Sequence, residues 1–243
     1  MNLILLFPED FISDRRVCLK GRRREHIRGI LSAQIGDELS VGILNGSTGK
    51  AKVISTGDEV QLDVNLTQPP PQPLPLTLIV PMIRPPMFKR LLFHAATLGI
   101  KKIIVLNFSR VEKSLWSASA LKPETIREQL ILGLEQAKDT VLPEVIVRAQ
   151  FKPFVEDELP ALAKGKLNLA AHPGGASLPT VLLQMRSAPV AEATGVNLVI
   201  GPEGGFVPYE VDKLVSLGFK TIDLGPRILR VDTALPYITG KLF

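Results

Sequence analysis

The chain has 243 residues, of which 45% are hydrophobic and 22% are charged, as is ordinary for a soluble globular protein. The sequence contains neither the roughly 18-residue apolar run that a membrane span needs nor the features of a signal peptide, so we expect a cytoplasmic protein. The single cysteine, Cys18, excludes an internal disulfide, and the three histidines lie too far apart for a zinc motif, so no metal is expected. A net charge of +5 is a weak indication of a nucleic-acid partner.

Residues 1–67 are expected to form a small, β-rich, barrel-like domain. Residues 1–7, 38–44 and 50–54 have strand patterns, and a helix is predicted over 25–33. Turn signals recur at Gly36-Asp37, Asn45-Gly46, Gly49 and Gly57-Asp58.

A dense basic run lies in this first segment. Lys20, Arg22, Arg23, Arg24 and Arg28 fall within nine positions. The run is either a solvated face or a set of RNA phosphate contacts.

A proline-rich stretch at residues 68–75 is the clearest boundary in the chain. It holds five prolines in eight residues, too many for a packed helix or a central strand. We therefore predict a stiff linker between residues 1–67 and a second domain over 76–243.

Strands and helices alternate after the linker, which predicts a mostly parallel α/β sheet. Strand patterns occur at 76–80, 101–106, 145–147, 167–171, 196–200 and 219–224. Helical patterns occur at 88–98, from Pro123 to 137, and near 156–164, 177–186 and 207–217. The helix that opens at Pro123 closes near Glu135-Gln136, which its pattern predicts to be surface residues.

Three loops that follow strands are candidate ligand sites, because ligands of such sheets bind beyond the carboxyl ends of the strands. They are residues 172–175, 201–205 and 224–234. The loop at 201–205 has three glycines and Glu203, but neither dinucleotide nor P-loop spacing. It suits a neutral or cationic ligand, or it is simply a tight turn.

The last loop combines Arg227, Arg230 and Asp232 before a final helix. We expect Thr233 to cap that helix, with Pro236 in its first turn. The cluster is either a ligand site or a surface salt bridge beside a cap. His172 at a strand end is by itself more typical of a structural residue.

Aromatic and basic residues also occur together in one earlier loop. Phe108 and Trp116 flank Arg110 and Lys113, a combination that can stack on single-stranded RNA. Packing in the core is the other interpretation, and the preferred one for Trp116.

Together these motifs resemble the small-subunit (16S) rRNA uridine-N3 methyltransferase family of the SPOUT superfamily. The resemblance rests on the run from Ile200 through the glycine loop to Phe206, followed by Leu224-Gly225-Pro226-Arg227-Ile228-Leu229-Arg230. Weaker matches are His26-Ile27, Ile30-Leu31, Gly36-Asp37, Asn45-Gly46, Leu98-Gly99-Ile100, Ser109-Arg110, Glu135-Gln136, Pro143-Glu144 and residues 169–173.

The resemblance implies a PUA-like N-terminal barrel that binds RNA, a trefoil-knotted methyltransferase domain and a homodimer. It implies S-adenosylmethionine as cofactor and 16S rRNA or the small ribosomal subunit as partner. The implied cofactor-binding residues are Leu169, His172, Pro173, Gly201, Pro202, Glu203, Gly204, Leu224, Gly225, Ile228, Leu229 and Arg230. The implied RNA-binding residues are Arg22, Arg23, Arg24, Arg28, Arg110, Lys113 and Lys138.

Catalytic roles follow from the same resemblance. Arg230 would stabilise the uridine anion, Asp232 would take its proton or orient Arg230, and Thr233 would bond a base oxygen or cap the helix. The chain departs from the family pattern at Ser32, His94, Thr97, Ala137-Lys138 and Val231-Asp232. Alternatives are a methyltransferase for another rRNA or tRNA position, or a non-catalytic RNA-binding protein of ribosome assembly.

Overall fold

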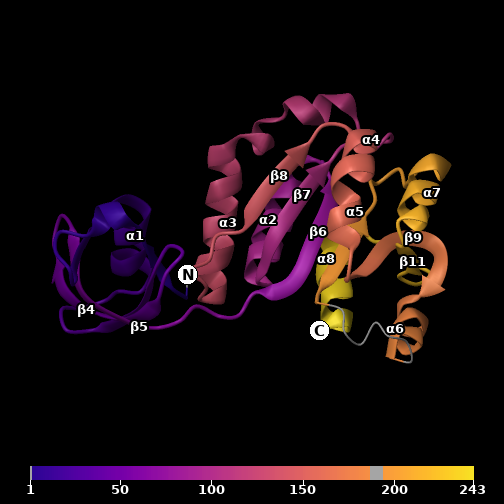
Figure 1. The fold of residues 1–243 in the computed structure, drawn as a ribbon. Coiled ribbons are helices and arrows are strands. Elements are labelled where there is room, and N and C mark those ends of the chain that lie inside the picture. Colours follow the sequence, from indigo (N-terminus) through magenta and orange to yellow (C-terminus); the bar gives the residue numbers. More distant parts are fainter. Residues whose placement is uncertain (1, 187–193) are drawn as a thin grey trace. The chain divides into compact units, whose positions relative to one another are not determined.

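A computed structural model describes residues 2–186 and 194–243 (Figure 1). Met1, with which the first strand was expected to begin, lies outside the described residues. The chain divides into two compact units. The first comprises Met1–Gln72 and Glu128–Leu142, and the second comprises Pro73–Arg127 and Pro143–Phe243.

The first unit contains a five-stranded sheet in the order β1-β3-β4-β5-β2. Neighbouring strands of this sheet pair antiparallel, except β1 and β3, which pair parallel. The Asn45-Gly46 turn is confirmed between β3 and β4, with Asn45 at a φ of 58°. The strands are β1 (Ile4–Leu6), β2 (Arg16–Leu19), β3 (Glu38–Ile43), β4 (Thr48–Thr56) and β5 (Val60–Gln68).

Two local predictions in this unit are wrong. The helix begins earlier than expected, as α1 (Gly21–Glu25), and continues as a π-helical turn over His26–Ile30 instead of reaching residue 33. Gly49 lies inside β4 and not in a turn. A Cβ at Gly49 would fall 1.9 Å from the carbonyl oxygen of Asn65, so the glycine is needed for the close approach of β5.

Glu135 is a third correction, because it is buried and not on the surface. It lies near the end of α3 (Pro123–Ala137) and is 1% exposed. Arg22 donates to its carboxylate at 2.9 Å, and its backbone oxygen accepts from the amide nitrogens of Asn2 and Leu3. Burial raises the pKa of the Glu135 carboxyl, against the opposing effect of Arg22. The local pattern gave no sign of this burial because its partners lie at the start of the chain.

The second unit contains a six-stranded, all-parallel sheet in the order β11-β9-β10-β6-β7-β8. This confirms the predicted parallel α/β architecture. The strands are β6 (Leu74–Pro81), β7 (Ile100–Leu106), β8 (Glu144–Arg148), β9 (Leu167–Ser177), β10 (Val196–Ile200) and β11 (Lys220–Asp223).

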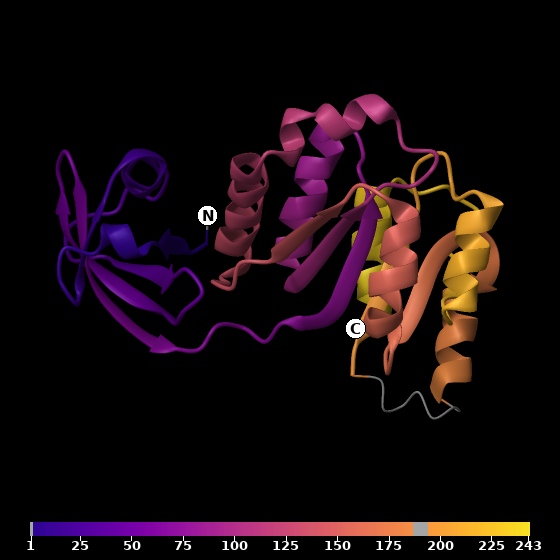
Figure 2. The same cartoon turned by 45° about the horizontal axis from the view of Figure 1, so that its top comes forward.

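Helices cover both faces of this sheet, with α5 on one side and α2 and α8 on the other (Figure 2). The helix predicted over 88–98 is confirmed as α2, which begins three residues earlier and is followed by Gly99 at a φ of 78°. No helix within residues 2–186 and 194–243 is long and apolar enough to cross a membrane. The helices are α2 (Pro85–Thr97), α4 (Phe151–Pro153), α5 (Leu159–Ala163), α6 (Leu178–Arg186), α7 (Pro208–Ser216) and α8 (Val231–Leu242).

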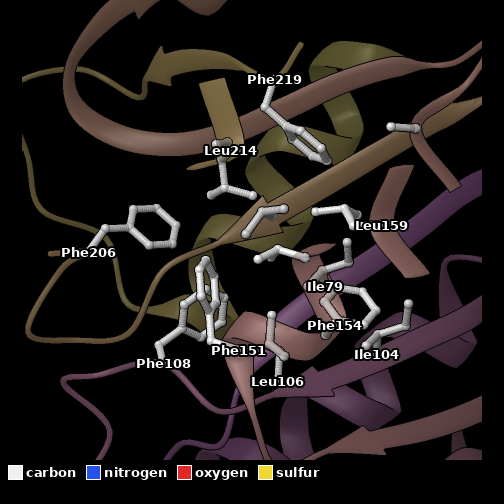
Figure 3. Close-up of a cluster of buried hydrophobic side chains, with 14 residues drawn as sticks. Ile79, Ile104, Leu106, Phe108, Phe151, Phe154, Leu159, Phe206, Leu214 and Phe219 are labelled. Carbon is white, nitrogen blue, oxygen red and sulfur yellow. The ribbon is translucent and has the colours of Figure 1, made fainter. Parts of the chain in front are cut away.

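An aromatic cluster fills one face of the parallel sheet (Figure 3). Ile79 and Ile104 from the sheet pack there with Phe154 and Leu159. The cluster extends to Phe108, Phe151 and Phe206, whose rings bring it to the loops after β7 and β10. The same apolar core that stabilises the sheet therefore also anchors the loops at its carboxyl end.

Strand β9 does not end before residues 172–175, as the sequence suggested, but runs on to Ser177. Its pairing with β11 is interrupted: Thr221 pairs with Ala170, and the next residue, Ile222, pairs with Ala176. Residues 171–175 therefore bulge out of the ladder with β11. β9 is therefore a continuous strand in which residues 171–175 do not pair with β11.

Candidate functional site

The chain segments at the carboxyl ends of β6, β7 and β10 enclose a cleft of about 420 Å³. Its lining combines apolar residues with two arginines and two glutamates. The lining residues are Met82, Ile83, Arg84, Ser109, Arg110, Val111, Glu112, Leu115, Pro202, Glu203 and Gly204. The cleft lies where a parallel sheet is expected to bind a ligand.

Two side chains fix the 201–205 loop to the loop after β7. Arg110 donates through Nη1 to the carbonyl oxygen of Gly204 at 2.7 Å. Glu210, which is fully buried, accepts from the amide nitrogens of Ser109 at 2.7 Å and Val207 at 3.0 Å. These bonds tie the C-terminal end of the glycine loop to the loop after β7.

The Phe206 ring joins the glycine loop to the β9 bulge. Its centroid lies 5.7 Å from that of His172, and a Cβ at Gly201 would fall 2.9 Å from the ring. Glycine at 201 is thus required by close packing. Nδ1 of His172 is buried and lacks a hydrogen-bond partner among the described residues, which leaves a polar atom available at the bulge.

Asp223 joins the bulge to the loop after β11. Its Oδ2 accepts from the amide nitrogen of Gly174 at 2.7 Å, and its Oδ1 accepts from that of Gly225 at 2.6 Å. Both bonds lower the pKa of the Asp223 carboxyl, and the bond from Gly174 has the larger effect. The three predicted loops are therefore linked to one another, through Phe206 and through Asp223.

The expected helix cap at Thr233 is wrong. Helix α8 begins at Val231, and the carbonyl oxygen of Arg230 already accepts from the amide nitrogens of Thr233 and Ala234. Thr233 is an exposed residue of the first turn, and Pro236 lies inside the helix. The earlier start buries the apolar side chain of Val231, while Pro236 removes one backbone hydrogen bond from the helix.

Asp232 and Arg230 do not pair with each other. Asp232 is 7% exposed and forms an ion pair with Arg90 of α2, with Nη2 and Oδ2 3.2 Å apart. Its Oδ1 is buried without a partner in the part of the chain that the structure describes. The Arg230 guanidinium instead reaches α2 at Met87, with Nη1 3.9 Å from Sδ. An acid and a base thus project from the same turn, each supported by α2.

The remaining predicted cofactor-binding residues differ in their exposure to solvent. Leu169 is fully buried in β9, whereas Gly225 and Ile228 are exposed, with Ile228 84% exposed. Leu224 and Leu229 are half-buried. Backbone and apolar side chains of the 224–229 segment are therefore accessible for contact with a ligand.

The predicted RNA-binding arginines have partners within the first unit. Arg22 bonds Glu135, Arg24 donates to the carbonyl oxygen of Asp58, and Arg28 donates to that of Gly57. Arg23 is committed to Asp10 and is 15% exposed. Each of them has a local structural partner in addition to any RNA contact.

Phe108 does not offer an exposed stacking surface, contrary to one of the two interpretations of its sequence. It is 2% exposed and its ring packs on those of Phe151 and Phe206. Trp116 is half-buried, while Arg110, Lys113 and Lys138 are exposed. Arg110 and Lys113 are therefore accessible to a ligand, whereas Phe108 belongs to the core.

Sequence reasoning missed Arg90, Glu210 and Asp223. Arg90 lies on a helix face, and its partner Asp232 is distant in the sequence. Glu210 carries the only early signal, since an acid three residues after a helix start is typical of a capping box. Nothing local pointed to Gly174 as a partner of Asp223.

The chain is similar to known proteins along its length. It is 27% identical to the ribosomal RNA small subunit methyltransferase E of Treponema pallidum over 96% of this chain and 87% of the relative. It is 24% identical to ribosomal RNA small subunit methyltransferase E 1 of Borreliella burgdorferi, over 96% and 94%.

The fold is shared with a solved structure. The crystal structure of a ribosomal RNA small subunit methyltransferase E from Neisseria gonorrhoeae, bound to S-adenosyl methionine, matches with a TM-score of 0.77. The match covers 100% of this chain and 96% of the other at 20% identity. The model of the RNA methyltransferase domain family matches residues 70–242, and the chain therefore belongs to that family.

Proposed function

We propose that this protein transfers a methyl group from S-adenosylmethionine to N3 of a uridine in 16S rRNA of the small ribosomal subunit. One observation carries the proposal: three glycine-bearing segments are linked through Phe206 and Asp223, and the last of them leads directly into a turn with Arg230 and the buried Asp232. Relatives over nearly the full chain are named as small subunit rRNA methyltransferases.

The residues present fit this cofactor. The site offers backbone groups, apolar side chains and the exposed carboxylates of Glu112 and Glu203, which offset the charges of Arg84 and Arg110 and disfavour a phosphate ligand. His172 adds a buried nitrogen that has no hydrogen-bond partner among residues 2–186 and 194–243. The residues that would hold the cofactor are Leu169, His172, Pro173, Gly201, Pro202, Glu203, Gly204, Leu224, Gly225, Ile228, Leu229 and Arg230.

When bound, S-adenosylmethionine would supply an electrophilic methyl group; the rest of the chemistry falls to the protein. Uridine N3 carries a proton and faces its pairing partner in a helix, so the base must be unpaired or flipped out. Oδ1 of Asp232, a buried atom that has no partner in the described part of the chain, would accept that proton, and Arg90 holds the other oxygen. Arg230 stabilises the negative charge that develops on the base oxygens, and the exposed Thr233 bonds one of them.

The RNA would be held by cations that are exposed or, for Arg23 and Arg24, partly buried. In the second unit these are Arg110 and Lys113, close to the cleft. In the first unit they are Arg22, Arg23, Arg24, Arg28 and Lys138, of which Arg23 has the least free surface. We infer that residues 1–67 form a PUA-like RNA-binding domain, joined by the linker at 68–75 to the methyltransferase domain at 76–243.

We also propose a trefoil knot, a homodimer and a cytoplasmic location for this protein. A trefoil knot of the SPOUT type is supported by the return of the chain from β11, at the sheet edge, to α8 packed on α2 and β10. A homodimer is supported by exposed apolar residues near the C-terminal end, Ile228, Tyr237 and Phe243. Cytoplasmic location follows from an rRNA substrate.

Two measurements test the proposal. Isothermal titration of the protein with S-adenosylmethionine should give one site per chain, and absence of binding would favour a non-catalytic RNA-binding protein. Mass spectrometry of rRNA from a deletion strain should show the loss of one 3-methyluridine from 16S rRNA. Loss of a modification in tRNA or in the large-subunit rRNA would reject the proposed substrate.

A further inference from the structure

Asp223, the last residue of β11, uses both carboxylate oxygens on backbone amides of two different segments. The donors, Gly174 and Gly225, stand at φ values of 81° and 106°, which glycine adopts with little strain. Neither donor belongs to the pairing between β9 and β11. The carboxylate therefore bonds to segments that the sheet itself does not hold at these positions.

The bulge makes this link important. Pairing of β9 with β11 skips residues 171–175, so the ladder fixes only the two ends of that segment. The bond from Gly174 to Asp223 closes the segment against the end of β11, while the bond from Gly225 turns the chain sharply after β11. One side chain thus sets the spacing between two predicted cofactor-binding segments.

We propose that Asp223 is a positioning residue that holds the 172–175 and 224–229 segments in the geometry that binds S-adenosylmethionine. This inference rests on the proposed function. Each of its oxygens accepts a backbone amide, so the role that we assign to Asp223 is exerted through the backbone. Its contribution is preorganisation: the segments are ordered before binding, so the cofactor does not have to order them.

Charge and shape both matter in this arrangement. Aspartate accepts at both oxygens, whereas asparagine accepts at one and directs an N–H₂ group at the second amide donor. Asp223→Asn therefore breaks one bond and places two donors against each other with almost no change in volume. Asp223→Glu keeps the charge and both acceptors but displaces them by one methylene. Asp157→Asn, at an exposed carboxylate of the same unit, is the matched control.

The test uses the full-length protein and two readouts. Isothermal titration measures the affinity for S-adenosylmethionine, and hydrogen exchange of the cofactor-free protein measures protection of the Gly174 and Gly225 amides. We expect Asp223→Asn to weaken binding about tenfold or more and to speed exchange at both amides. Asp223→Glu should lie between Asp223→Asn and the wild type, and Asp157→Asn should match the wild type. Thermal unfolding establishes that each variant is folded.

The outcomes separate the two proposals. Normal cofactor affinity in Asp223→Asn, with the wild type binding well, overturns the role of Asp223 and leaves the proposed function intact. Unchanged amide exchange in that variant likewise overturns the positioning role. Failure of the wild type to bind S-adenosylmethionine overturns the proposed function and this inference with it.

Discussion

Arg90 of α2 and Asp232 of α8 form an ion pair in which the acid is buried and the base is largely exposed. The pair joins the first helix of the parallel-sheet unit to the last one. It occupies only one oxygen of Asp232, because Oδ1 has no partner among the described residues. A buried carboxylate with one free oxygen is costly to maintain, and such a cost is typical of a functional site.

Removal of Arg90 should therefore impair turnover more than cofactor binding. We expect Arg90→Ala to lower kcat by about a hundredfold, because Asp232 loses the group that fixes its orientation. Arg90→Lys should recover part of this loss, since it keeps the charge but not the planar donor group. Steady-state kinetics with S-adenosylmethionine and RNA provide the measurement. Lys89→Ala, at the adjacent exposed position, is the control, and an equal effect there would refute a specific role for Arg90.

The side chain of Arg230 should be needed for chemistry and not for the cofactor, which the backbone of this residue would contact. We expect Arg230→Ala to reduce methyl transfer by about a hundredfold or more, because the developing charge on the base loses its partner. Affinity for S-adenosylmethionine, measured by titration, should change little. Arg227→Ala, in the same exposed turn, should retain most activity. Near-normal turnover in Arg230→Ala would remove Arg230 from the mechanism.

Glu210 should govern the stability of the second unit. Its buried carboxylate satisfies two amide donors, so Glu210→Ala should lower the free energy of unfolding by about 2 to 3 kcal/mol. Denaturant unfolding followed by circular dichroism measures this change. Glu203→Ala, at an exposed glutamate of the neighbouring loop, should be nearly neutral. Equal stability of the two variants would show that the Glu210 bonds contribute nothing.

The lowered pKa of Asp223 predicts how its contribution depends on pH. A carboxyl with a lower pKa in the folded than in the unfolded protein stabilises the fold above its unfolded pKa, and this stabilisation is lost as pH falls through the folded pKa. The stability difference between wild type and Asp223→Asn should stay constant from about pH 7 to about pH 5 and shrink below about pH 4. A difference that instead grows on acidification would contradict the role of the carboxylate.

The sequence predicted the parallel sheet and the segments at its carboxyl end because those features have local causes. Apolar runs bounded by glycine and proline marked β10, α7 and the Gly99 helix end, and the structure has each of them. The start of α8 was misplaced because the pattern favoured Thr233 as a cap, whereas the helix begins at Val231, whose apolar side chain is buried. Tertiary packing outweighs a local capping preference here.

The parts that could not be predicted depend on contacts between distant residues. Asp232 was recognised and was expected either to take a proton or to orient Arg230, but its ion-pair partner is Arg90. Glu135 has the pattern of a surface residue and is buried because the N-terminal segment and Arg22 cover it. Asp223 ends a short strand with no local feature to single it out, and only the bulge in β9 brings Gly174 to it.

The central claim is methyl transfer to uridine N3, and one measurement tests it most directly. The purified protein is incubated with labelled S-adenosylmethionine and either 16S rRNA or isolated small ribosomal subunits that lack the modification. The RNA is then digested and its nucleosides are identified by mass spectrometry. The proposal predicts labelled 3-methyluridine from a single site, abolished by Arg230→Ala. Labelled methyl on any other nucleoside, or no label at all with a protein that binds the cofactor, would contradict it.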